Sequence, residues 1–136
     1  MRVFFDNCTS PTLAATLDGY LAHLGHGAAH IRDLPCGRNA SDIEWIAFLR
    51  ESGEDWIVVT GDQRIHRNKA ERAAFRHAGL KGIVLAAAYQ KTPVNRQAAM
   101  LLWRWPDIAG LIATLAPPFL IEMPISRSGR LRVLPV

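Results

Sequence analysis

Short apolar runs alternate with amphipathic segments over the first two thirds of the chain. The run Trp56–Thr60 is nearly continuous in its hydrophobicity, which is typical of a strand that is covered on both faces. This strand–helix alternation predicts an α/β fold, a three-layer α/β/α domain with a central, mainly parallel sheet and helices on both faces. Strands are predicted at 2–5, 28–32, 56–60 and 82–86, with helices at 11–24, 41–52 and 69–78 between them.

Particular residues mark where these helices begin. Ser10 suits an N-cap because Pro11 is favoured at the first helical position. Ser41 and Glu44 have the spacing of a capping box, in which each residue satisfies a backbone N–H of the other. The buried face of the helix that follows is expected to carry Ile43, Ile46, Ala47 and Leu49.

The pattern changes after about residue 90 and becomes mainly helical. A helix is expected from Thr92–Pro93 to about Trp105. Pro106 should interrupt it, with a short further helix at 107–115. Trp103 and Trp105 are two positions apart, so both cannot face inward on a regular helix, and one of them is expected at an interface.

The last apolar runs, 119–123 and 131–134, flank a turn rich in serine and glycine and could pair as a terminal hairpin. A chain of 136 residues is long enough to bury one core, and we expect a single domain over 1–136.

The composition favours a cytoplasmic protein without a membrane segment. No apolar stretch reaches the roughly 18 residues of a membrane span, and the charge of Arg2 comes too early for a signal peptide. Cys8 and Cys36 are too few for a disulfide framework or a zinc site, so we expect reduced thiols. The formal net charge of +4 fits a polyanionic partner such as RNA, although many cytosolic proteins share it.

Three aspartates carry the strongest chemical signal. Asp6 and Asp62 directly follow predicted strands, and Asp42 opens a predicted helix between them. Ligands of parallel α/β sheets bind outside the carboxyl ends of the strands, so these acids should lie close together. Clustered carboxylates repel one another unless a cation lies between them, and oxygen ligands favour Mg²⁺ or Mn²⁺. Each aspartate also has a competing local explanation. Asp6 could cap the chain before the first helix, Asp62 could belong to a Gly-Asp turn, and Asp42 could interact with the helix dipole.

Two further acids are weaker candidates for the same metal site. Asp33 follows the second strand, and Glu44 already has a structural role in the capping box. The remaining acids, Glu71 among them, are interpreted as solvated surface charges.

A basic cluster begins just after Asp62. It could contact RNA phosphates, or it could simply be a solvated helix face, and the sequence favours neither explanation. Its members are Arg64, Arg67, Lys69, Arg72 and Arg76.

At this level of detail the chain resembles a known family. The segment Val3–Asn7, followed by a helix that starts with proline, resembles the opening of the PIN-like nucleases. The segments Ile31–Leu34, Ala40–Asp42 and Trp56–Asp62 follow in the motif order of the small branch found among bacterial toxin–antitoxin toxins, the VapC-like proteins. The resemblance covers roughly residues 1–90.

The resemblance implies a Mg²⁺- or Mn²⁺-dependent endoribonuclease that is the toxin of a type II toxin–antitoxin pair. It also implies a cognate antitoxin as partner and a homodimer. Asp6, Asp42 and Asp62 match the catalytic and metal-binding acids of the family. Larger PIN domains usually have a fourth acid, for which Asp33 and Glu44 are the candidates here.

Two rival functions remain open. The first is a PIN-like module with a depleted site that acts by binding RNA or protein. The second is a flavodoxin-like receiver domain, in which strand-end aspartates hold Mg²⁺ and one is phosphorylated. Such a domain places a lysine near the acids late in the sheet, and Lys81 and Lys91 match that requirement poorly.

Overall fold

The computed structural model describes residues 1–136. The strands are β1 (Arg2–Phe5), β2 (Gly27–His30), β3 (Trp56–Thr60), β4 (Lys81–Leu85), β5 (Phe119–Met123) and β6 (Arg132–Leu134). The α-helices are α1 (Pro11–Ala22), α2 (Asp42–Ser52), α3 (Arg64–Arg67), α4 (Lys69–His77) and α5 (Val94–Ile112). Two 3₁₀ turns, η1 (Ile31–Asp33) and η2 (Ala87–Lys91), follow β2 and β4.

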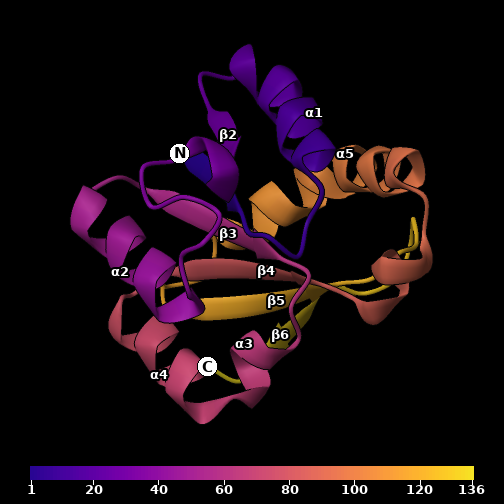
Figure 1. The fold of residues 1–136 in the computed structure, drawn as a ribbon. Coiled ribbons are helices and arrows are strands. Elements are labelled where there is room, and N and C mark those ends of the chain that lie inside the picture. Colours follow the sequence, from indigo (N-terminus) through magenta and orange to yellow (C-terminus); the bar gives the residue numbers. More distant parts are fainter.

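The strands form one sheet in the order β2-β1-β3-β4-β5-β6 (Figure 1). Each neighbouring pair from β2 to β5 is parallel, and only β6 runs antiparallel to its neighbour, β5. The predicted α/β fold with a mainly parallel central sheet is therefore confirmed. Because β1 and β3 are adjacent, with Phe5 in register with Val59, the residues after both strands emerge side by side.

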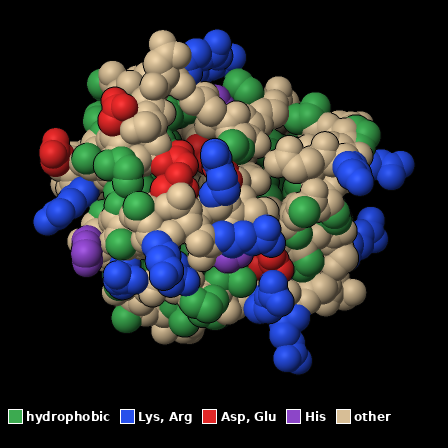
Figure 2. Space-filling view, turned by 60° about the horizontal axis from the view of Figure 1, so that its bottom comes forward, with side chains coloured by type: hydrophobic (Ala, Val, Ile, Leu, Met, Phe, Trp, Pro, Cys, Tyr) green, Lys and Arg blue, Asp and Glu red, His purple; other side chains and the backbone are tan.

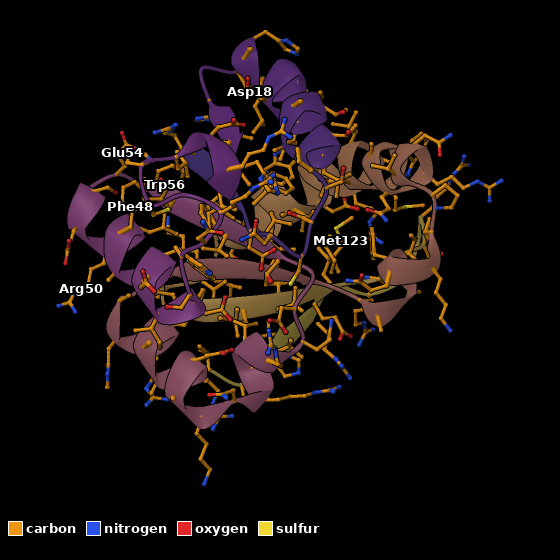
Figure 3. The ribbon with its side chains drawn as sticks, in the orientation of Figure 1. Asp18, Phe48, Arg50, Glu54, Trp56 and Met123 are labelled. Carbon is orange, nitrogen blue, oxygen red and sulfur yellow. The ribbon has the colours of Figure 1, made fainter.

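Helices cover both faces of the sheet. α1 and α5 pack on one face, and α2 and α4 on the other (Figure 1). Alternate residues along each strand contribute to the two cores, as the pleat of a strand requires. Figure 3 shows Trp56 and Phe48 on the α2 side, where Trp56 belongs to the core and the partly buried Phe48 packs against it. Met123 belongs to the core under α1 and α5.

The buried face of α2 differs from the expected one. The capping box is present, since the Ser41 hydroxyl accepts from the Glu44 N–H at 3.2 Å and the Glu44 carboxylate accepts from the Ser41 N–H at 3.3 Å. However, Ile43 is 48% exposed, and Trp45 takes the inward position because its ring packs on Phe4 with centroids 4.8 Å apart. The buried residues of α2 are Trp45, Ile46 and Leu49.

Three further expectations about local structure need correction. The second strand ends at His30 rather than at residue 32, and the short helix α3 lies between Asp62 and α4, where the sequence pattern predicts no helix. α5 also continues past Pro106, so the predicted interruption is wrong. A proline removes one helical hydrogen bond, but Trp105 and Ile108 on either side of it are buried in the core and hold the helix in line.

The end of the chain agrees with the predicted pairing. β5 and β6 form the expected antiparallel pair, and β5 also joins β4, which extends the parallel sheet. Trp105 is buried and Trp103 is exposed, as their spacing requires. No helix is both long and apolar enough to cross a membrane.

Candidate metal centre

Asp6 lies buried at the carboxyl end of β1. Its carboxylate accepts hydrogen bonds from the Thr60 hydroxyl and, at 3.1 Å, from the N–H of Cys8. Burial raises the pKa of Asp6 to about 7, against the effect of these hydrogen bonds, and the charges of Asp42 and Asp62 raise it further. The Thr60 hydroxyl, at the end of β3, therefore ties the Asp6 carboxylate to the neighbouring strand.

Asp62 lies two residues past the end of β3. Its N–H donates to the Thr60 hydroxyl at 2.9 Å, so one hydroxyl connects the Asp62 backbone with the Asp6 carboxylate. The guanidinium of Arg64 donates to both Asp62 oxygens, with Nη2 at 2.7 Å from Oδ2 and Nε at 3.0 Å from each oxygen. This pairing lowers the pKa of Asp62 and keeps the group ionised.

Asp42 and Glu71 lie in the first turns of α2 and α4. The Oδ1 of Asp42 accepts from the buried indole N–H of Trp45 at 2.9 Å, which fixes this carboxylate. One carboxylate oxygen from each of Asp42, Asp62 and Glu71 lies within 4.8 Å of the other two. We call these three residues the acidic triad.

The acidic triad fits a hard divalent cation. Its donors are all carboxylate oxygens, and two oxygens on opposite sides of a Mg²⁺ ion lie about 4.2 Å apart. The Oε2 of Glu71 is buried without a hydrogen-bond partner. Burial, followed by the charges of Asp42 and Asp62, raises the pKa of Glu71. A cation among the carboxylates would relieve both the unpaired oxygen and the mutual repulsion.

Residues 1–87 match the family described as PIN like domain. The chain belongs to the PIN-like domain family. PIN-like domains are generally nucleases that use divalent metals, which agrees with the chemistry of the acidic triad. Searches of the curated proteins and of the solved structures find no match.

The structure brings together some of the predicted acids and separates others. Asp42 and Asp62 share the acidic triad, with Asp6 beside them. Asp33 lies on η1, where it is exposed and 3.6 Å from Arg32, and the Glu44 carboxylate is occupied in the capping box. The metal-binding roles of all these residues stay predictions, but the geometry supports neither Asp33 nor Glu44 as the fourth acid.

Glu71 is the acid that the sequence interpretation missed. The sequence pattern favours a solvated surface charge at this position, whereas the structure places Glu71 half-buried in the acidic triad. A signal was present in the sequence. Glu71 lies in the first turn of the helix that follows the Asp62 loop, the same kind of position that Asp42 holds in α2.

Gly61 allows two loops to meet beside the acids of this PIN-like domain. A Cβ at this position would lie 2.8 Å from the Cys8 carbonyl oxygen and 2.9 Å from the side-chain nitrogen of Gln90. Real Cβ atoms essentially never approach backbone so closely. The glycine therefore allows the loop after β1, which carries Asp6, to pack directly on the end of β3.

Basic side chains border the acids. Figure 2 shows acidic side chains gathered near the centre of one face, with several Lys and Arg side chains around them. Arg64 is paired with Asp62, Arg72 is half-buried, and the other three residues of the predicted cluster are exposed: Arg67, Lys69 and Arg76. Phosphate binding by these residues stays a prediction.

The structure weighs against a receiver domain. Lys81 lies at the amino end of β4, where its ammonium donates to Asp55 at 2.7 Å. This ion pair lies at the edge of the sheet opposite to the acidic triad, so Lys81 cannot serve the acids.

Proposed function

We propose that this PIN-like domain is an endoribonuclease that depends on Mg²⁺ or Mn²⁺ and is the toxin of a type II toxin–antitoxin pair. The main support for the nuclease function is that Asp42, Asp62 and Glu71 converge at the carboxyl edge of the sheet, with the buried Asp6 beside them. The assignment to toxins rests on the motif order shared with the VapC-like proteins.

In this proposal the acids have separate tasks. Asp42, Asp62 and Glu71 hold the cation, and Trp45 keeps Asp42 aimed at it. When bound, the cation lowers the pKa of water and offsets charge on the phosphoryl oxygens. Asp6 adds negative charge from within the protein, held in place by Thr60.

The basic residues beside the acids supply the contacts to the RNA strand. The Arg64 side chain is 70% exposed, so it can exchange Asp62 for a substrate phosphate once a cation neutralises the acids. Contacts of this kind hold the RNA without reading its sequence, and they weaken as salt rises. An antitoxin for this basic chain is expected to be acidic or to have an acidic tail.

The test is cleavage of a small-RNA pool by purified protein in Mg²⁺, Mn²⁺ or EDTA. We expect discrete products with either metal and none in EDTA. Asp62→Asn and Glu71→Gln should abolish the products, whereas Asp33→Asn, a matched change of an acid outside the acidic triad, should leave them. Cleavage that persists in both variants would place the activity elsewhere or in a contaminant.

The alternative is a catalytically depleted PIN-like module that acts by binding RNA or protein. One observation favours it: Thr60 and Arg64 already provide partners for Asp6 and Asp62 within the protein. RNA binding without cleavage in either metal, together with no measurable heat of Mn²⁺ binding, would support this alternative.

A further inference from the structure

A cavity of about 420 Å³ opens between the first half of α5 and the chain that follows β5. It lies outside the residues matched to the PIN-like family. Its walls include Trp103, Arg96 and Arg127 together with the apolar side chains of Met100 and Ile125, and no acid lines it. We call it the Trp103 pocket, and its charge suits an anionic occupant.

Trp103 is the most exposed large hydrophobic side chain of the protein, at 62%. The guanidinium of Arg127 lies over its ring, with Cζ at 4.8 Å from the centroid. Unpaired RNA bases stack on aromatic rings and on guanidinium planes. Arg127 and Trp103 already stack on each other, so a base would extend this stack from an outer face of the pair. Arg96 and Arg127 add the positive charge that a phosphate beside such a base requires.

The loop that carries Arg127 is held in place by a buried charge. Arg104 is only 5% exposed, and its Nη1 donates to the carbonyls of Ser126 and Gly129 at 2.8 Å each. Its Nε donates to Asp107 at 3.1 Å. The segment on both sides of Arg127 is therefore tied to α5, so the pocket is formed before any ligand binds.

The Trp103 pocket and the acidic triad lie on the same edge of the sheet. The pocket follows the carboxyl ends of β4 and β5, and the acids follow those of β1 and β3. The two sites belong to different helix layers, since α5 covers one face of the sheet and α2 and α4 cover the other.

A smaller cavity lies between the two sites. Cys8 and Gly61 line it on the side of the acids, and Gln90 and Gln97 on the other. The side-chain amide of Gln97 also donates to the carbonyl of Thr92, a residue that lines the Trp103 pocket. A single strand could therefore follow polar surface from one site to the other.

We propose that the Trp103 pocket binds an unpaired base and its phosphate in the RNA strand that is cleaved at the acidic triad. The indole and the Arg127 guanidinium stack on the base, and Arg96 contacts the phosphate. The pocket thus selects single-stranded RNA and sets the position of the scissile phosphate. This inference rests on the proposed ribonuclease function.

The experiment measures binding of a fluorescein-labelled single-stranded RNA in EDTA, where cleavage cannot interfere, by fluorescence anisotropy. Trp103→Ala should weaken binding about 5- to 100-fold, as expected for loss of one stacked base, and Trp103→Phe should restore most of the affinity. Arg96→Ala should also reduce the salt dependence of binding by about one phosphate contact. Leu24→Ala, another exposed hydrophobic residue, is the matched control and should bind like the native protein.

Cleavage measured in parallel separates the two proposals. If the native protein cleaves RNA and Trp103→Ala binds RNA as tightly as the native chain, the RNA-binding role of the pocket is wrong. The proposed nuclease function would still stand. Unchanged RNA affinity together with conversion of a dimer into a monomer would identify the pocket as a subunit interface instead. Native protein that neither cleaves nor binds RNA would overturn both.

Discussion

The carboxyl edge of the sheet carries opposite charges at its two sides. Beyond β1 and β3 lie four carboxylates, Asp6 and the acidic triad, partly or wholly withdrawn from water. Beyond β4 and β5 lies the Trp103 pocket, which has two arginines, an exposed indole and no acid. The carboxylates beyond β1 and β3 repel a phosphate group unless a cation is present. The arginines beyond β4 and β5 attract a phosphate group without a cation.

This difference separates two tasks that a nuclease must perform. The acids can hold a metal but repel RNA phosphates, so attraction of RNA falls to the basic residues around them and to the Trp103 pocket. The basic side can hold RNA but has no group suited to bind a hard cation. The division also follows the chain, since the family match covers residues 1–87 and the Trp103 pocket lies after them. Variants on one side should therefore leave the other task intact.

The largest expected effect comes from Asp62→Asn. Loss of a charged member of the acidic triad should lower the rate of RNA cleavage by at least about 1,000-fold, or about 4 kcal/mol of transition-state stabilisation. RNA affinity in EDTA should stay within about 2-fold of native, because the Trp103 pocket is untouched. A loss of RNA binding as large as the loss of rate would show that the two sides are not independent.

The next effect is a pH dependence of stability in the metal-free protein. The pKa of Asp6 rises from 3.8 to about 7 on folding, so the folded state binds its proton more tightly and loses stability as pH rises from about 4 to 7. A shift of about 3 units corresponds to at most about 4 kcal/mol at 1.36 kcal/mol per unit.

Urea unfolding in EDTA, compared between the native chain and Asp6→Asn, isolates this contribution. The free energy of unfolding of the native chain should fall relative to that of Asp6→Asn between pH 4 and 7. The same pH dependence in both proteins would contradict the raised pKa of Asp6. Mn²⁺ should reduce the difference, because a nearby cation favours the ionised carboxylate.

Arg104→Met should have a smaller effect, which is confined to the side of the Trp103 pocket. It leaves two loop carbonyls without their charged donor, so we expect a loss of about 2 kcal/mol in the free energy of unfolding. RNA affinity should fall because the loop carrying Arg127 is released. Calorimetry should find native Mn²⁺ binding, and weakened Mn²⁺ binding would show that the two sides are coupled.

The smallest effect is expected for Arg64→Ala. The guanidinium of Arg64 offsets the charge of Asp62, so its removal should let the acidic triad bind Mn²⁺ about 2- to 5-fold more tightly. Arg50→Ala is the matched control, since Figure 3 shows this side chain pointing away from α2 on the outside of the molecule. Weaker Mn²⁺ binding in Arg64→Ala would mean that Arg64 helps to build the site.

The sequence was a good guide where one local rule dominates. The strand-end rule for parallel sheets located Asp6 and Asp62, because β1 and β3 are nearly continuous apolar runs and proved to be neighbours. The capping box located the start of α2 and so the position of Asp42.

The sequence was a poor guide where contacts between residues far apart along the chain determine the structure. Glu71 reaches the acids because α4 packs beside α2, and its position in the first turn of α4 points to the site only once that packing is known. Pro106 stays inside α5 because the core on both sides outweighs its lost hydrogen bond. The Trp103 pocket requires the loop after β5 to fold back onto α5 through Arg104, a contact between residues more than 20 positions apart.

The most direct test of the account is Mn²⁺ binding by calorimetry to the native chain, to Glu71→Gln and to Asp33→Asn. Glu71 lies with Asp42 and Asp62 in the structure, whereas Asp33 lies apart from them on η1. These two acids therefore separate what the geometry predicts from what the sequence pattern predicts. We predict Mn²⁺ binding to the native chain, at least about 10-fold weaker binding to Glu71→Gln, and native affinity in Asp33→Asn. Equal Mn²⁺ affinity in the native chain and Glu71→Gln, or no binding to either, would contradict the acidic triad as a metal centre.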